Sequence, residues 1–159
     1  MKYLILIFIS FVSFQSCTHG NHYSIQGIDY QTGPCFGSCP VFHLIINSEK
    51  KATLNARRVV PIYSKDSLTE DEKMEGSYHT TIDSIHFSAI VNMLHDIDFV
   101  HLDSYDITVA DAPDCTLIIN YDNGKIKRIY DGGQNGTLGL RQLYGLLSDL
   151  RKNQHWVKD

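Results

Sequence analysis

The segment that decides the fold reads Cys115-Thr-Leu-Ile-Ile-Asn-Tyr-Asp-Asn-Gly-Lys-Ile-Lys-Arg-Ile-Tyr-Asp131. Two strand-like runs flank Asn123-Gly124, a dipeptide that favours the positive φ angles of a two-residue hairpin turn. A helix is expected to follow at about 137–152, because its apolar residues recur at helical spacing. The apolar stripe consists of Leu140, Leu143, Tyr144, Leu147 and Leu150. The order of hairpin and then helix predicts an α+β domain.

The first half of the chain shows a related pattern. We expect a first strand at 23–30, a strand at 41–47, a returning strand at 52–58 with an extension at 59–63, a loop at 64–76 and an edge strand at 77–82. A second helix begins after a cap at Asp83 or Ser84. Its stripe consists of Phe87, Ile90, Val91, Leu94 and Ile97. Both helices are amphipathic, so the sequence predicts a two-layer sandwich with a mainly antiparallel sheet covered by two helices.

The two halves share a short sequence. Leu44-Ile45-Ile46-Asn47 recurs as Leu117-Ile118-Ile119-Asn120, and the two helical stripes match position for position. One hypothesis is a duplicated hairpin-plus-helix unit with an insertion in the first copy. The alternative is coincidence, because amphipathic helices resemble one another and Leu-Ile-Ile is common in strands.

The amino-terminal residues predict export. Lys2 precedes an apolar run at 3–14, which is shorter than the roughly 20 residues of a membrane span. Phe14-Gln15-Ser16-Cys17 then looks like a bacterial lipobox. We expect removal of the signal peptide 1–16, lipidation of Cys17, a short tether over 17–24 and a single α+β domain over 25–159. The alternatives are an uncleaved anchor helix and a plain signal peptide with a coincidental cysteine.

The net charge of the chain limits the classes of partner that the sequence predicts. The chain has 14 basic and 18 acidic residues, and removal of Lys2 with the signal peptide leaves 13 against 18, or −5. A mildly acidic domain offers no electrostatic footprint for nucleic acid. We therefore expect membrane contact through the lipid on Cys17, a location in the bacterial cell envelope facing the periplasm or the exterior, and a possible envelope protein as partner.

Three further cysteines remain after Cys17. Cys35 and Cys39 lie in a compact Gly- and Pro-rich turn before a strand, and we predict a stapling disulfide between them. A redox dithiol is an alternative, although such motifs usually space their cysteines by two residues near a helix. A metal site formed with His43 is another. Cys115 is expected to be a buried small hydrophobe, or to pair with either of the other two.

The motif Cys35-Phe36-Gly37-Ser38-Cys39-Pro40 resembles that of a bacterial lipoprotein-borne family, the domain of unknown function 6438. The family pattern is a cysteine, an aromatic residue, glycine, a small residue, cysteine and proline before a strand. The resemblance extends over about Tyr23–Trp156, with weaker similarity at Asp111-Ala112-Pro113 and in the terminal helix. It implies a secreted or lipid-anchored domain, and it carries over no activity and no catalytic residues.

Other candidate sites have simpler explanations. Asp103, Asp106, Asp111 and Asp114 lack the ligand spacing of a calcium loop and suit a solvated loop with Asx turns. The Gly132–Gly136 turn lacks the pattern of a phosphate-binding loop. We therefore expect no catalytic residue, metal or cofactor, and predict a non-catalytic binding or structural module that acts through its sheet or the 101–114 loop. A thiol-disulfide protein or other enzyme centred on Cys35 and Cys39, and an inhibitor-like module, are the alternatives.

Overall fold

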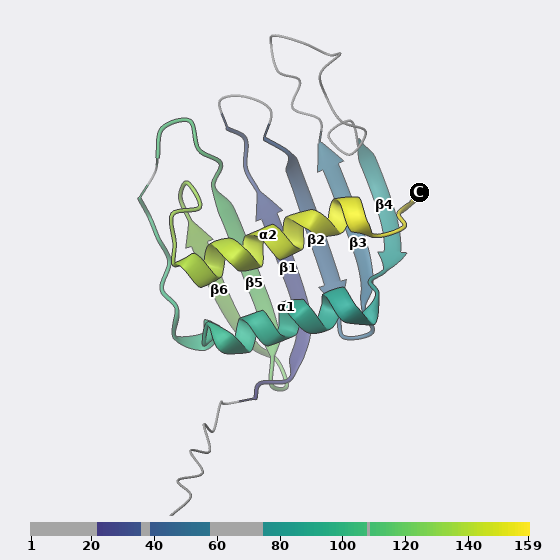
Figure 1. Cartoon of the computed structure of the whole chain (residues 1–159), viewed down its shortest axis with the longest axis horizontal. Helices are drawn as coiled ribbons and strands as arrows, with labels where there is room; N and C mark the ends of the chain where they lie inside the picture. The colour runs from purple at the N-terminus through teal and green to yellow at the C-terminus, as the bar shows by residue number, and fades with distance from the viewer. Residues whose placement is uncertain (1–21, 36–38, 58–74, 108) are drawn as a thin grey trace, which may run out of the picture.

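A computed structural model describes residues 22–35, 39–57, 75–107 and 109–159. Within these ranges the chain forms a seven-stranded sheet in the order β6-β5-β1-β2-β3-β4-β7, together with two α-helices (Figure 1). The strands are β1 (Ile25–Thr32), β2 (Val41–Asn47), β3 (Lys51–Arg57), β4 (Gly76–Thr81), β5 (Cys115–Tyr121), β6 (Lys125–Asp131) and β7 (Val157–Lys158). The helices are α1 (Ser84–Asp96) and α2 (Leu138–Asn153), with a short 3-10 helix at Phe99–His101.

Every pair of neighbouring strands is antiparallel, which confirms the predicted α+β class and sheet type. β1 is an interior strand that pairs with β2 on one edge and with β5 on the other. Tyr30 stands opposite both Leu44 and Leu117, and Ile28 opposite both Ile46 and Ile119. The two copies of Leu-Ile-Ile-Asn therefore flank β1 in the same register.

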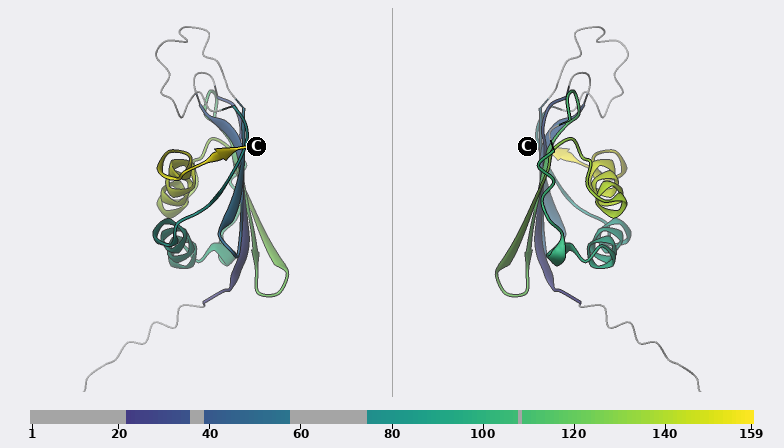
Figure 2. Two further views of the ribbon diagram at one scale, coloured as in Figure 1. Left: turned by 90° about the vertical axis from the view of Figure 1, so that its right-hand side faces the viewer. Right: turned by 90° about the vertical axis from the view of Figure 1, so that its left-hand side faces the viewer.

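Both helices lie on the same side of the sheet, as the side views show (Figure 2). Asp83 caps α1, as predicted, by accepting hydrogen bonds from the backbone N–H groups of Ile85 and His86. Thr137 caps α2 through a hydrogen bond from the N–H of Leu140. Gln154 joins the end of α2 to the start of α1, because its side-chain amide contacts both the backbone and the carboxylate of Asp83. Neither helix is long and apolar enough to cross a membrane.

The core forms between the helices and the inward side of each strand. Inward and outward residues alternate along β2 and β3, so that Leu44 and Leu54 are completely buried whereas their neighbours face away from the helices. α2 also buries the charged Arg151 near its end. The buried apolar residues of the two helices are Ile90, Leu94, Leu140, Leu143, Tyr144, Leu147 and Leu150. All seven belong to the stripes expected from the sequence.

The hypothesis of a duplicated hairpin-plus-helix unit is wrong as a structural repeat. β2 and β5 run in the same direction and turn their leucines to the same side, since both pair antiparallel with β1. Two copies of one unit would then place their second strands on the same side of the first. Instead β3 and β6 lie on opposite sides, each away from β1. This arrangement is mirror-like, and no rotation or translation of one hairpin produces the other.

Three other expectations need correction or fall outside the described ranges. The predicted edge strand, β4, is covered by β7 at Tyr78 and His79. The predicted 101–114 loop is partly ordered, because Tyr105 forms a parallel bridge with Asp131 at the edge of the sheet. The predicted strand extension at 59–63 and nearly all of the loop at 64–76 lie outside the described residues, as do the signal peptide and Cys17.

Because helices cover only one face of the sheet, substitutions at neighbouring positions of β2 should lower the free energy of unfolding by different amounts. Leu44→Ala removes a fully buried side chain and should lower the free energy of unfolding by about 3 kcal/mol, through lost transfer energy and a cavity. Ile45→Ala affects a side chain that is 41% exposed and should cost less than about 1 kcal/mol. Urea unfolding followed by circular dichroism measures both values, and equal losses would contradict the fold.

Candidate functional site

The face of the sheet turned away from the helices is the candidate site. No helix of the described ranges covers it (Figure 2). Outward residues of four neighbouring strands form two rows across it, which we call the bare face. The first row is Gln31, His43, Asn55 and Ser77, and the second is Asp29, Ile45, Thr53 and His79.

The first row borders a polar hollow of about 650 Å³. Arg57 also lines this hollow, so the polar groups around the hollow include an imidazole, amides and a guanidinium cation. His43 Nε2 lies 2.9 Å from Asp29 Oδ1, and the Gln31 amide donates to the same carboxylate oxygen over 3.3 Å. These contacts hold three polar side chains in one cluster on an otherwise open surface.

The His43–Asp29 pair resembles two members of a hydrolytic triad, and the serine in the same row is Ser77. Ser77 donates its hydroxyl to Asn55 Oδ1 over 2.6 Å. It is also two strands away from His43, or about 10 Å at the usual strand spacing. A nucleophile must lie within hydrogen-bonding reach of its base, so Ser77 is not placed to act as a nucleophile activated by His43.

The second row borders an apolar hollow of about 730 Å³ near the β4–β7 edge. Ile45 and Val157 line it and are 41% and 47% exposed. His79 stands between them in the sheet, with Nδ1 2.6 Å from a carboxylate oxygen of the carboxyl-terminal Asp159. The bare face thus joins a polar half to an apolar half, a mixture typical of surfaces that bind another protein reversibly.

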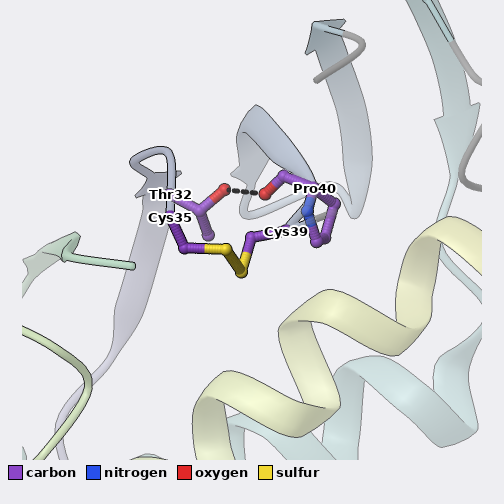
Figure 3. Close-up of a disulfide and its surroundings, with 4 residues drawn as sticks. All are labelled: Thr32, Cys35, Cys39 and Pro40. Carbon is purple, nitrogen blue, oxygen red and sulfur yellow. Dashed lines mark hydrogen bonds between the residues drawn. A yellow bond between two sulfur atoms is a disulfide. The ribbon is translucent and has the colours of Figure 1, made fainter. Parts of the chain in front are cut away.

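A disulfide closes the β1–β2 connection at the end of the sheet. Cys35 and Cys39 are bonded, with their Cα atoms 5.6 Å apart. Beside the disulfide, the nearly buried Thr32 hydroxyl donates to the carbonyl of Pro40 over 2.8 Å (Figure 3). The same hydroxyl accepts a hydrogen bond from the N–H of Phe42. The disulfide and the two hydrogen bonds of Thr32 both hold the start of β2 against the end of β1.

The surroundings of Cys35 do not favour redox chemistry. Cys35 lines a hollow of about 620 Å³ together with Asp111, Asp114 and Tyr130. A catalytic thiolate is usually stabilised by a nearby cation or by a helix N-terminus, whereas carboxylates destabilise it. The residue after Pro40 begins a strand rather than a helix. The disulfide therefore suits a structural role.

Cys115 is buried within the core and is not bonded to another cysteine. Burial, followed by the charges of Asp131 and Asp114, raises the pKa of its thiol to about 12. The rings of Tyr30 and Tyr144 stack nearby, 5.6 Å apart, and burial also raises the pKa of both phenols. All three groups are neutral at physiological pH, so none of the three is an activated nucleophile.

Two other candidates from the sequence take structural roles. No group of three His, Cys, Asp or Glu residues within the described ranges could hold a metal ion, and these ranges include the aspartates of the 101–114 segment. In the Gly132–Gly136 turn, the N–H groups of Asn135 and Gly136 donate to the buried carboxylate of Asp131 over 2.8 and 2.9 Å. A carboxylate of the chain therefore occupies the place that a bound anion would take.

The sequence analysis named the sheet as a binding surface, but it did not identify which face of the sheet or which residues. It identified the outward positions of the strand at 41–47 without asking what covered them. The sequence did contain a signal for this face. His43 and Ile45 alternate with buried residues of the strand, and an imidazole and a large apolar side chain are unusual on a strand face that only contacts solvent. The pairing of His43 with Asp29 depends on strand register and was not predictable from spacing alone.

The fold and site define a small α+β domain with a sheet covered by helices on one face and a disulfide-closed connection between β1 and β2. Residues 26–151 match the family model described as Domain of unknown function (DUF6438), and the chain belongs to this family. The resemblance seen at Cys35–Pro40 is thereby confirmed. No curated protein matches the chain significantly in sequence.

Removal of the disulfide should weaken the fold without abolishing it. A closed loop this short removes little entropy from the unfolded chain, so Cys35→Ser with Cys39→Ser should lower the free energy of unfolding by about 2 kcal/mol or less. Chemical unfolding measures the change, with the reduced wild-type chain as the matched control. A double variant that no longer unfolds cooperatively would contradict a merely stapling role.

Cys115 should resist alkylation in the folded protein. Its thiol is buried and its raised pKa leaves almost no thiolate at neutral pH. Iodoacetamide should therefore modify the Cys115 peptide in concentrated guanidinium but not in the native state, as measured by peptide mass spectrometry. Rapid modification of the native chain would show that the core around β5 opens readily.

Proposed function

We propose that this protein is a lipid-anchored protein of the bacterial envelope that binds another envelope protein through its bare face and does not act as an enzyme. The observation that carries the binding role is the one-sided coverage of the sheet, with a polar and an apolar hollow side by side. Lipid anchoring is supported by the sequence Phe14-Gln15-Ser16-Cys17.

The entry of the chain into the domain is consistent with a membrane-tethered orientation. Ser24 and Asp122 exchange two hydrogen bonds, of 2.8 and 3.0 Å, so the chain enters beside the β5–β6 turn. The disulfide follows β1 and lies at the opposite end of that strand (Figure 1). Seven residues from Cys17 reach at most about 25 Å, so a lipidated Cys17 would hold the β5–β6 end close to the bilayer.

In this orientation the strands run away from the membrane and the bare face extends along them. A partner embedded in or attached to the same membrane would meet the bare face sideways. The disulfide-closed end would lie farthest from the lipid. A protein partner suits this surface better than a small substrate, because the hollows are broad and open rather than enclosed.

The anchor and the binding face are tested separately in cells. Intact mass of the membrane-extracted chain should show a mature protein that starts at an acylated Cys17, and Cys17→Ala should move the protein to the soluble fraction. A photo-crosslinking amino acid at Thr53, on the bare face, should give a discrete cross-linked protein. The same group at Gln142, on the exposed side of α2, is the matched control.

Ile45→Asp adds the decisive variant. It places a charge in the apolar hollow at an exposed position, and unchanged thermal unfolding would show that the fold is intact. We expect it to abolish the cross-link from Thr53. Equal cross-linking from Thr53 and Gln142, or a cross-link that survives Ile45→Asp, would contradict binding through the bare face.

A further inference from the structure

One edge of the sheet is open over part of its length. β6 is the terminal strand and pairs with β5 along its whole inner edge, from Lys125 to Asp131. On its outer edge Tyr105 forms a bridge with Asp131 and donates its N–H to the carbonyl of Tyr130 over 2.7 Å. That coverage is confined to the carboxyl-terminal end of β6. The β5–β6 hairpin bends away from the helix layer at its other end (Figure 2).

The contacts of Tyr130 show which backbone groups of β6 point toward the open edge. Its N–H donates to Ser104 Oγ over 3.0 Å and its carbonyl accepts from Tyr105, so both backbone groups point to the outer edge. Backbone groups alternate between the two edges of a strand with a period of two. The N–H and carbonyl groups of Arg128 and Ile126 therefore also point outward, and they form an unfilled template for another strand.

The side chains along this edge are cationic in an acidic protein. Lys125, Lys127 and Arg128 lie within four residues, whereas the whole chain carries a formal charge of −4. The Lys125 ammonium lies 3.6 Å from Asp122. Neither Lys127 nor Arg128 forms an ion pair with a residue in the described ranges. Ile126, which lies between Lys125 and Lys127, is 66% exposed.

Lysines on an edge strand often serve to prevent aggregation. Here they would repel a second copy of the same strand, because three cations would face three cations. The same charges attract a strand of opposite charge. The open backbone, the cations and the exposed isoleucine together select an extended acidic segment with apolar residues at alternate positions.

We propose that residues 125–129 of β6 form a docking site for an extended acidic segment of a partner protein, which adds to the sheet as a further strand. The segment pairs with the backbone of Ile126 and Arg128. Its carboxylates lie on the face of the sheet that carries Lys125 and Lys127, and its apolar residues lie on the face that carries Ile126. This site requires neither the lipid anchor nor the bare face, so it stands or falls independently of the function proposed above.

The test measures binding of a fluorescent Glu-Val-Glu-Val-Glu-Val peptide to the full-length chain by anisotropy, with Lys-Val-Lys-Val-Lys-Val as the comparison. We expect at least tenfold tighter binding of the acidic peptide. Hydrogen exchange should slow at the amides of Ile126 and Arg128 on binding. The amide of Lys127 points toward β5 and should change little.

Two sets of variants separate backbone pairing from simple charge attraction. Ile126→Pro removes an outward N–H without removing a bond to β5, and should weaken binding about tenfold. Ile126→Ala keeps the N–H and should weaken it less than threefold. Lys127→Glu with Arg128→Glu changes surface charges alone, so it remains informative if the proline variant fails to fold. It should abolish binding of the acidic peptide.

Three results would overturn the proposal. The first is equal affinity for the two peptides, and the second is unchanged peptide affinity in a folded Ile126→Pro variant. The third is that phosphatidylglycerol vesicles compete with the peptide and bind the Ile126→Pro variant as tightly as the unchanged protein. The last would identify a general anionic-surface contact. Ile45→Asp should leave peptide binding unchanged, which distinguishes failure of this site from failure of the bare face.

Discussion

The pairing of β1 on both of its edges is the constraint on which the rest of the structure depends. Tyr30 meets Leu44 on one side and Leu117 on the other, and all three side chains are completely buried. A shift of one residue in either pairing would turn a Leu-Ile-Ile segment to the opposite face and expose its core residues. This register therefore fixes which side of the sheet the helices cover and which side stays bare.

The surfaces available for binding are consequences of that constraint. Two helices supply enough apolar area for one face of the sheet, so residues such as Ile45 and His43 are left outward. β7 protects one edge at β4, whereas Tyr105 protects only the end of β6. The remaining open edge carries three cations, Lys125, Lys127 and Arg128, within four residues. The proposed binding face and the proposed strand-addition edge thus both arise from the same incomplete coverage.

Much of this architecture was predictable from local patterns. The strand at 41–47, the hairpin around Asn123-Gly124, the Asp83 cap and both helical stripes depend on residues close in sequence, and each was found. The place of β1 between β2 and β5 depends on pairing between distant segments, which hydrophobic alternation does not specify. For that reason the shared Leu-Ile-Ile-Asn suggested a repeat, when its physical meaning is the same register on both edges of β1.

The shifted pKa values of the described residues belong to the closed core and to a helix cap. Catalytic groups usually acquire shifted pKa values in a partly enclosed site that substrate can enter. Here the large pKa increases belong to Tyr30, Cys115 and Tyr144, which burial in the closed core keeps neutral. The pKa of the exposed Asp83 is lowered by the hydrogen bonds with which it caps α1 and holds Gln154. The hydrogen bonds of Asp83 favour its charged form and so favour the folded state at neutral pH. The three buried groups are neutral at that pH in the folded and in the unfolded chain, so their raised pKa values add no stability there.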